Sequence, residues 1–560
     1  MEHTDDDSRK LARRLTQQIT DGLAEHQRVG SGVFGADYQE NWDSTTIYWE
    51  PQYEKSDRST STNTSKSDRY SRSSGFEAHR AKSLGPITEP IDASTNGGQN
   101  PSMDKIYMAS NELDGLLLDG TAVPINLPLA LLQQITGNFD DSLKIGQGGF
   151  AVVYKGVLRS GCVAVKKLLN NQTIEEGPFY RETSILMSVK HPNIARFMGY
   201  CANTENVAMK IDGKYIYYER RERLLCFEYI VNGSLESRIT DELRGLEWHT
   251  RYQIIKGICE GLKYLHKEKG IVHMDLKPAN VLLDDLLLPK ITDFGISKDL
   301  YGVSHVVTMG RLGTHGYCAP EYIHYGDVSL KSDIFSLGII FMDLVTGRKE
   351  DPNKDPNRKN ILRRWRYRWN KSGNHPPLGC KQVIKCIEIA GRCTSDDTKR
   401  RPDISDIVSW LNETESIGDA DESSVGPILR PYSWELLDFD PLELHFPFEI
   451  NKEISCPVQL TNTRDHYVKF HIQLLNSSST KHYRIEPNRG IVPPQSKTNV
   501  MVILQAQNIR PHDIMGKDEF VVRCTVVKDG LMAHNISKDM FDGMSGDVVD
   551  MATLTAAFAP

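Results

Sequence analysis

The 560-residue chain lacks several features that mark special classes of protein. Its ten cysteines include no CxxC pair, which argues against a zinc site or a thioredoxin-like motif. The start, MEHTDDDSRK, lacks the basic-then-apolar order of a signal peptide, and Glu2 excludes N-myristoylation. The most apolar stretch, 113–135, is broken by charges and prolines, whereas a transmembrane helix needs about 20 apolar residues in a row. We therefore expect a cytoplasmic protein with free thiols and no transmembrane segment.

The chain also has no excess of positive charge. It contains 67 Lys and Arg against 74 Asp and Glu, for a formal net charge of −7. This balance gives no global electrostatic reason to bind nucleic acid or an anionic membrane, and we expect neither as the main partner. The sequence has no internal repeat, and its slightly polar composition indicates that part of the chain is disordered.

Changes in composition divide the chain into four parts. We expect residues 1–120 to be largely disordered, because the Ser/Thr-rich stretch 55–75 has almost no aliphatic residues to bury. Within this part, residues 5–26 have an apolar stripe, which fits either a docking helix or a marginal isolated one. Residues 138–412 have the texture of a globular domain, and 413–432 form a linker. Short strand-forming runs separated by Pro, Gly and Asn predict an all-β sandwich over 433–560.

The globular part begins with a glycine-rich segment, IGQGGFAVVYKG, that starts at Ile145. Glycines let backbone N–H groups approach phosphate oxygens closely, although this pattern alone is more often an ordinary hairpin turn. Lys166 follows in the β-branched run VAVKK. A lysine on a half-buried strand needs a paired charge, and Glu182, sixteen residues later, is the natural partner.

Further polar motifs follow in a fixed order. IVHMDLKPANVLLD carries Asp275, Lys277 and Asn280, and KITDFG carries Asp293. GTHGYCAPEY and KRRPD come later. In this order and spacing, the motifs of 138–412 closely resemble those of the eukaryotic protein-kinase family.

The resemblance implies a two-lobed α+β fold that uses ATP and Mg²⁺. It implies that Lys166, held by Glu182, contacts the α- and β-phosphates of ATP. Asp275 would orient the acceptor hydroxyl and take its proton. Lys277 would neutralise charge on the transferred phosphate.

The resemblance also assigns metal, acceptor and nucleotide contacts. Asn280 and Asp293 would hold Mg²⁺, and Thr314 would help to seat the acceptor residue. Glu321 and Arg401 would form a structural ion pair. The remaining ATP-binding residues would be Ile145, Gly146, Gln147, Gly148, Gly149, Val153, Phe227, Glu228 and Ile230.

The loop DLKPAN is similar to the serine/threonine form, and NGSL and SDIFSLGIIFMDLVTG resemble plant receptor-like kinases. The chain is similar to a cytoplasmic member of that group, with three departures. Ala151 stands where a third glycine is usual. Met274 replaces an arginine that would pair with a phosphate on the activation loop, so we expect activity without such a phosphate. Residues 211–223 are a polar insertion, which we expect to form an exposed hairpin.

The last part, 433–560, resembles a major sperm protein domain through 436–462, 483–507 and 547–559. Such domains are immunoglobulin-like sandwiches that bind other proteins, and VAP-type members bind acidic peptides through a basic groove. Here the corresponding strand is more apolar, with positive charge only at Lys469 and His471. We therefore expect a partner of another kind, or self-association.

The run NILRRWRYRWNKS, 360–372, mixes arginines with aromatic residues. Such a mixture can bind single-stranded nucleic acid by stacking. However, Trp365 and Trp369 lie four residues apart and would share one inward helical face. A structural or substrate-docking role is therefore favoured.

These observations predict a serine/threonine protein kinase in intracellular signalling, which transfers the γ-phosphate of Mg-ATP to protein hydroxyls. The Ser-rich arm offers sites for autophosphorylation. The alternative is a catalytically weak kinase fold that acts as a scaffold, with the C-terminal domain recruiting partners. A small-molecule phosphotransferase is disfavoured, since GTHGY and APE belong to protein-substrate docking.

Overall fold

The computed structural model describes most of the chain after residue 100. The expected helix over 5–26, the Ser/Thr-rich stretch 55–75 and most of the linker 413–432 lie outside the described residues. Those residues are 101–169, 176–211, 214–300, 302–310, 312–347, 358–416, 435–447, 449–475, 482–507, 518–527 and 549–559.

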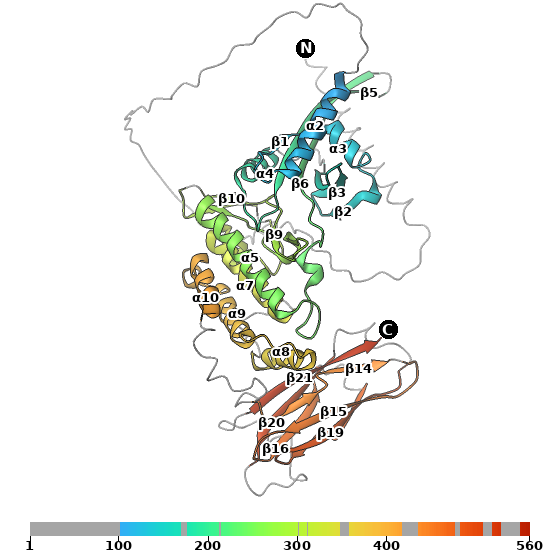
Figure 1. Cartoon of the computed structure of the whole chain (residues 1–560), viewed down its shortest axis with the longest axis vertical. Coiled ribbons are helices and arrows are strands. Elements are labelled where there is room, and N and C mark those ends of the chain that lie inside the picture. Colours follow the sequence, from blue (N-terminus) through green and yellow to red (C-terminus); the bar gives the residue numbers. More distant parts are fainter. Residues whose placement is uncertain are drawn as a thin grey trace, which may run out of the picture. The chain divides into compact units, whose positions relative to one another are not determined.

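The first lobe is built on a six-stranded sheet of order β1-β5-β6-β4-β3-β2 (Figure 1). Neighbouring strands are antiparallel except for β1, which pairs in parallel with β5. Helix α4 (Gly177–Ser188) accompanies the sheet and carries Glu182. The strands are β1 (Ile125–Asn126), β2 (Lys144–Gln147), β3 (Ala151–Val157), β4 (Cys162–Leu168), β5 (Phe197–Ile211) and β6 (Lys214–Glu228).

Two helices cover this sheet, α2 (Pro101–Leu118) and α3 (Leu129–Ile135), both blue in Figure 1. Helix α2 gives the end of the segment 1–120 a defined structure, while residues 1–100 lie outside the described residues, so the expectation of a largely disordered segment stays a prediction. Its Leu113 is fully buried with residues of α3 and of the sheet, so the interrupted apolar stretch 113–135 serves to pack the lobe. At β1 the chain approaches so closely that a Cβ on Gly199 would lie 2.2 Å from the carbonyl oxygen of Ile125.

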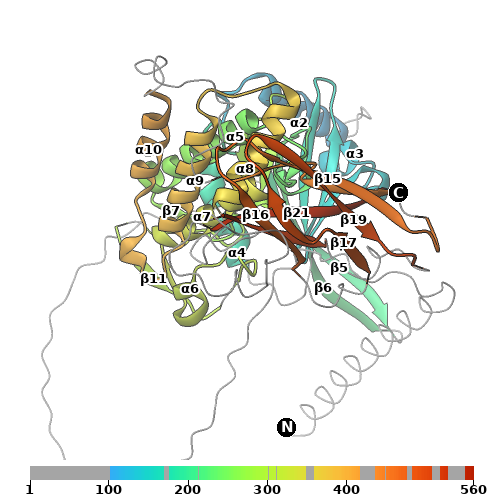
Figure 2. The same ribbon diagram turned by 90° about the horizontal axis from the view of Figure 1, so that it is seen from below.

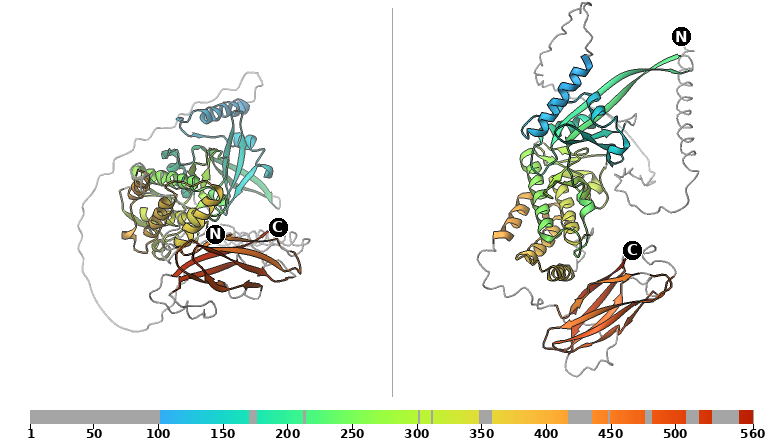
Figure 3. Two further views of the ribbon diagram at one scale, coloured as in Figure 1. Left: turned by 60° about the horizontal axis from the view of Figure 1, so that its bottom comes forward. Right: turned by 45° about the vertical axis from the view of Figure 1, so that its right-hand side comes forward.

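Strands β5 and β6 continue beyond the sheet as a long two-stranded ribbon (Figure 3). Each strand has 15 residues, and their pairing runs out to Ile211 and Lys214. Tyr215 and Tyr217 near its tip are exposed. The polar insertion at 211–223 therefore belongs to an exposed hairpin, as its composition indicated.

The second lobe is mainly helical. Its long helices are α5 (Trp248–Lys263), α7 (Leu330–Thr346), α8 (Arg358–Ser372), α9 (Gly379–Cys393) and α10 (Ile404–Ser416). The apolar stripe of α5 is buried, and α7, apolar nearly all round, is buried along most of its length, as expected for an interior helix. Helix α10 runs four residues past position 412, into the expected linker.

Short strands shape the loops of this lobe. Strand β7 pairs with β10, β8 with β9, and β11 with β12, all antiparallel. These pairings hold the polar motifs close to the helical core. The elements are β7 (Ile271–Val272), β8 (Val281–Leu283), β9 (Pro289–Ile291), β10 (Lys298–Asp299), β11 (His305–Val307), α6 (Pro320–Tyr325) and β12 (Asp327–Ser329).

Residues after 435 form a sandwich of two sheets, orange to red in Figure 2, which confirms the all-β prediction. The sheet orders are β13-β15-β19-β17 and β14-β21-β20-β16-β18. Lys469 and His471 on β16 are both buried, so they do not line an exposed basic groove. The strands are β13 (Asp438–Asp440), β14 (Glu443–Pro447), β15 (Ile454–Asn462), β16 (Val468–Leu474), β17 (Tyr483–Glu486), β18 (Arg489–Val492), β19 (Ser496–Leu504), β20 (Glu519–Val526) and β21 (Val549–Ala559).

Candidate active site

Lys166 stands at the centre of a charged cluster between the lobes. Its Nζ, on β4, donates to Glu182 Oε1 at 2.9 Å and to Asp293 Oδ1 at 2.7 Å. Burial disfavours the charged amine, but the charges of Asp293 and Glu182 outweigh this and raise the pKa of Lys166. The cationic lysine in turn lowers the pKa of Asp293, so both groups are charged at neutral pH.

A second cluster forms around Asp275, in the loop after β7. Lys277 Nζ lies 3.0 Å from Asp275 Oδ2 and donates to Thr314 Oγ1 at 2.6 Å. Thr314 Oγ1 donates to Asp275 Oδ1 at 2.8 Å, and Asn280 Nδ2 donates to Asp275 Oδ2 at 2.9 Å. All four side chains are buried, so each holds the others in place.

Asp333, at the start of α7, fixes the loop that carries Asp275 by accepting hydrogen bonds from its backbone. Its carboxylate accepts hydrogen bonds from the backbone N–H groups of His273 at 2.7 Å and Met274 at 2.9 Å. It also lies 2.9 Å from Nε2 of His266 and is fully buried. Nothing in the sequence analysis indicated that Asp333 would fix the loop that carries Asp275.

The glycine-rich segment connects β2 with β3. A Cβ on Gly148 or Gly149 would meet no described atom within 4 Å, so the protein itself does not require glycine at either position. Gly146 lies beside Val153 on β3, and Ile145 is 45% exposed. Gln147 ends β2 and pairs with β3.

The end of β6 leads into the connection between the lobes. Phe227 is buried against Phe197, with ring centroids 5.4 Å apart. The backbone N–H of Glu228 donates to the Arg196 carbonyl at 3.0 Å. The Glu228 carboxylate accepts from Lys290 Nζ at 3.0 Å, and Ile230 follows as a buried residue.

Met274 occupies an apolar setting instead of facing an acidic or phosphorylated group. Its side chain is buried in a cluster with Val272, Leu300, Tyr322 and Val328. Val306 of β11, in the segment between Asp293 and α6, packs against the same cluster. The residue that replaces the expected arginine therefore anchors this segment by apolar contact.

Arg401 and Glu321 form the ion pair expected from the resemblance. The guanidinium donates two hydrogen bonds of 2.7 Å, one to each carboxylate oxygen. Arg401 is 2% exposed, so this bidentate ion pair is buried and stabilises the helical lobe.

The sequence matches two families of domain. Residues 139–410 match the protein kinase domain, and 436–542 match the MSP (major sperm protein) domain. No helix in the described part of the chain is long and apolar enough to span a membrane.

Curated relatives are plant receptor-like kinases. Cysteine-rich receptor-like protein kinase 6 of Oryza sativa subsp. japonica is 36% identical over 54% of this chain and 42% of its own length. Cysteine-rich receptor-like protein kinase 25 of Arabidopsis thaliana is 33% identical over 55% of this chain and 46% of its own length. The G-type lectin S-receptor-like serine/threonine-protein kinase SD1-13, also of Arabidopsis thaliana, is 33% identical over 55% of this chain. The chain thus matches less than half the length of each of these relatives.

The charged clusters, the two-lobed fold and these matches agree. The chain carries a protein kinase domain, followed by an MSP domain.

Proposed function

We propose that the chain is a serine/threonine protein kinase that transfers the γ-phosphate of Mg-ATP to hydroxyl groups of proteins. One observation carries the proposal: Lys166 is paired with Glu182 and Asp293 at the same time. The lysine that would contact the phosphates and the carboxylate that would hold the metal ion are thereby paired with each other.

We propose that ATP binds between the glycine-rich segment and the end of β6. The open space above Gly148 and Gly149 fits a loop whose backbone N–H groups approach phosphate oxygens. Because the Glu228 N–H is already donated to Arg196, its carbonyl is the group that would accept from the adenine amine. Ile145 and Val153 would cover the base.

The residues present also fit Mg²⁺, which prefers oxygen ligands and bridges phosphates in such sites. Asp293 offers an ionised carboxylate. Because Asn280 donates through Nδ2 to Asp275, its amide oxygen is the atom left for a cation. Mg²⁺, when bound, would neutralise negative charge on the phosphates.

Asp275 would accept the proton of the acceptor hydroxyl, through the carboxylate that Thr314 and Asn280 orient. Lys277, 3.0 Å from that carboxylate, would balance the negative charge of the phosphate in transfer. The hydroxyl of Thr314 lies between the two and would position the acceptor residue beside them.

We propose that this activity does not need a phosphate on the activation loop. A phosphate acts there by pairing with a cation, but Met274 offers only an apolar side chain within an apolar cluster. The same cluster already anchors the loop through Leu300 and Val306.

We place the kinase in cytoplasmic signalling, with protein substrates. All ten cysteines are free, which suits a reducing compartment. The scaffold alternative is disfavoured by the intact pairing of Lys166 with Glu182.

Phosphate transfer from radiolabelled Mg-ATP, to the protein itself and to a generic basic protein, tests the proposal. The Asp275→Asn protein is the control, and losing this base should lower the rate at least about 10²-fold. If the Asp275→Asn control transfers phosphate as fast as the unaltered protein, the activity comes from a contaminating kinase. Intact ATP binding without transfer would favour the scaffold.

A further inference from the structure

Helix α8 carries the run of arginines and aromatics that the kinase chemistry does not use. Its first face points into the helical lobe. Trp365 and Trp369 are both buried, with ring centroids 5.8 Å apart, and Trp365 also lies against Trp248. The two tryptophans are thus occupied by packing, as their spacing predicted.

A second face binds the segment 242–247, which precedes α5. Arg364 Nε donates to Glu242 Oε2 at 2.8 Å. Arg368 donates to the backbone carbonyls of Arg244 and Gly245, each at 2.7 Å. This face fastens α8 to the kinase domain.

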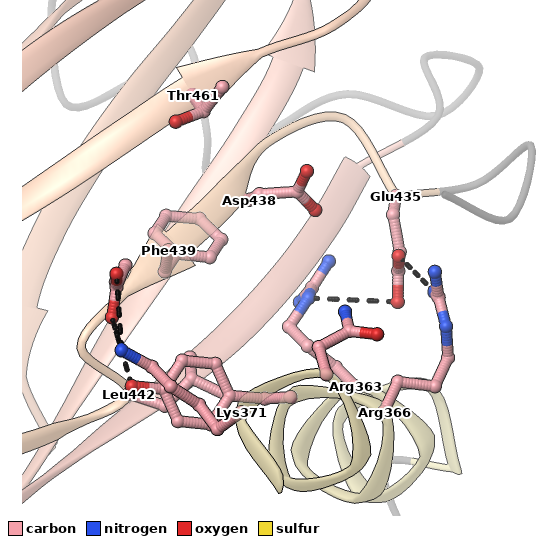
Figure 4. A pocket seen from close by; sticks show the side chains of 11 residues that line it. Arg363, Arg366, Lys371, Glu435, Asp438, Phe439, Leu442 and Thr461 are labelled. Carbon is pink, nitrogen blue, oxygen red and sulfur yellow. Dashed lines mark hydrogen bonds and ion pairs between the residues drawn. The ribbon is translucent and has the colours of Figure 1, made fainter. Parts of the chain in front are cut away.

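The third face, which we call the sandwich face of α8, contacts the MSP domain. Its residues follow the helical spacing of three, four, seven and eight positions, so they lie on one side of the helix. They are Arg363, Arg366, Tyr367, Asn370 and Lys371. Figure 4 shows Arg363 and Arg366 both directed toward Glu435.

Acidic residues of the MSP domain meet each cation of the sandwich face. Arg363 Nη2 donates to Asp550 Oδ1 at 2.8 Å and to Oδ2 at 2.6 Å. Arg366 pairs with Glu435. Lys371 Nζ lies 3.0 Å from Asp440 Oδ1, which also accepts from the hydroxyl of Tyr367 at 3.0 Å.

The central pairs are buried. The side chains of Asp550 and Glu435 are 0% and 2% exposed, and that of Arg363 is 6% exposed. Asp550 Oδ2 also accepts from the backbone N–H of Leu436 at 2.9 Å. The charges on one surface are opposite in sign to those they meet on the other, and this complementarity makes the contact specific.

We propose that the partner of the sandwich face of α8 is the MSP domain of the same chain. The MSP domain is then a fixed part of the kinase's helical lobe, docked by the Arg363–Asp550 and Arg366–Glu435 pairs. The arginines of α8 are accordingly not a recruitment site for nucleic acid or for a separate acidic protein.

A zero-length cross-link tests this in the full chain. A carbodiimide activates a carboxylate, a lysine amine displaces the resulting urea, and an amide bond forms. Lys371 and Asp440 suit this reaction, because both are 58% exposed and 3.0 Å apart. Lys267 and Asp403, 2.7 Å apart within the kinase domain, are the internal standard.

Mass spectrometry of the cross-linked peptides should find the Lys371–Asp440 link in the unaltered protein. Arg363→Glu should reduce it at least about tenfold relative to the standard, since breaking a buried ion pair shifts the docking equilibrium by more than that. Arg358→Glu makes the same charge change at an exposed position of α8 and should leave the link intact. The inactive Asp275→Asn protein should also form it, so the result is independent of the proposed activity.

Three outcomes would overturn the proposal. The first is that the Lys267–Asp403 standard cross-link forms but the Lys371–Asp440 cross-link does not. The second is that the yield of the Lys371–Asp440 cross-link is the same in Arg363→Glu as in the unaltered protein. The third is a link that joins isotope-labelled to unlabelled chains in a mixture, which would make the partner a second copy. If Arg363→Glu also lost the standard link through misfolding, Glu435→Gln on the MSP side would be read in the same way.

Discussion

The hydroxyl of Thr314 donates a hydrogen bond of 2.8 Å to Oδ1 of Asp275, and it accepts one of 2.6 Å from Lys277. This hydroxyl therefore fixes the angle between the proposed base and the proposed phosphate-neutralising cation. Thr314→Ser keeps the hydroxyl and should stay within about threefold of the original kcat. Thr314→Ala should lower kcat about 10- to 100-fold, because a hydrogen bond to a charged group contributes about 1.5–3 kcal/mol. Steady-state phosphate transfer gives the kcat of both variants. Equal kcat values for Thr314→Ser and Thr314→Ala would contradict the positioning role of the hydroxyl.

Lys166 and Lys167 are neighbours on β4 with different partners. Lys166 pairs with Glu182 and Asp293, whereas Lys167 pairs with Glu222 at 3.2 Å. Lys166→Met should lower kcat about 10²- to 10³-fold, the range found when a group that stabilises transition-state charge is removed. Lys167→Met makes the same chemical change one position away and should leave the rate nearly unchanged. If the two variants lost activity equally, the loss would reflect damage to β4 and not to the phosphate contact.

Met274 leads to a prediction about regulation. Ser304 and Thr308 lie on the segment that Met274 anchors. Position 274 offers no cation that could pair with a phosphate on either residue. Ser304→Ala and Thr308→Ala should each retain phosphate transfer within about twofold, as expected for surface changes away from the site. The rates are compared after phosphatase treatment of all three proteins. Collapse of activity in either variant would show that a loop phosphate acts through some other contact.

The parts of the site that the sequence predicted are those held by short motifs. Asp275, Lys277 and Asn280 lie within six residues of one another, so any fold that keeps the loop keeps them close. Lys166 and Glu182 were predictable as a pair because a buried lysine needs a counter-charge. The bond from Asp333 to the loop was not predictable, since 58 residues separate it from Asp275 and only the packed helix brings them together.

Helices α2 and α8 show a second limit. The apolar stretch 113–135 was rejected as a membrane span because charges and prolines interrupt it, yet those interruptions do not prevent α2 from burying Leu113. On α8, tryptophan spacing revealed the inward face. The roles of Arg363 and Arg366 could not be assigned, because their acidic partners lie in another domain, up to 187 residues away.

The Arg401–Glu321 pair should be a large contributor to stability. Removing one partner of a buried ion pair leaves an uncompensated charge and costs about 3–5 kcal/mol. Arg401→Met should therefore lower the unfolding free energy of the kinase domain by about that amount. Arg400→Met, at a neighbouring side chain that is 81% exposed, should change it by less than about 0.5 kcal/mol. Urea unfolding followed by tryptophan fluorescence measures the unfolding free energy of both variants. Similar unfolding midpoints would mean that the Arg401–Glu321 pair does not stabilise the domain.

Helix α2 should stabilise the sheet that carries Lys166. Leu113 is fully buried with Leu131 of α3 and with Val165 of β4, next to Lys166. Leu113→Ala should cost about 2–5 kcal/mol, as for other large-to-small changes in a core. Met108→Ala, at a side chain on the same helix that is 71% exposed, is the matched control. Hydrogen exchange resolved by peptide should show faster exchange across β4, β5 and β6 in Leu113→Ala alone, with the MSP strands unchanged. Equal protection in both variants would contradict the proposed contribution of Leu113 to the stability of this sheet.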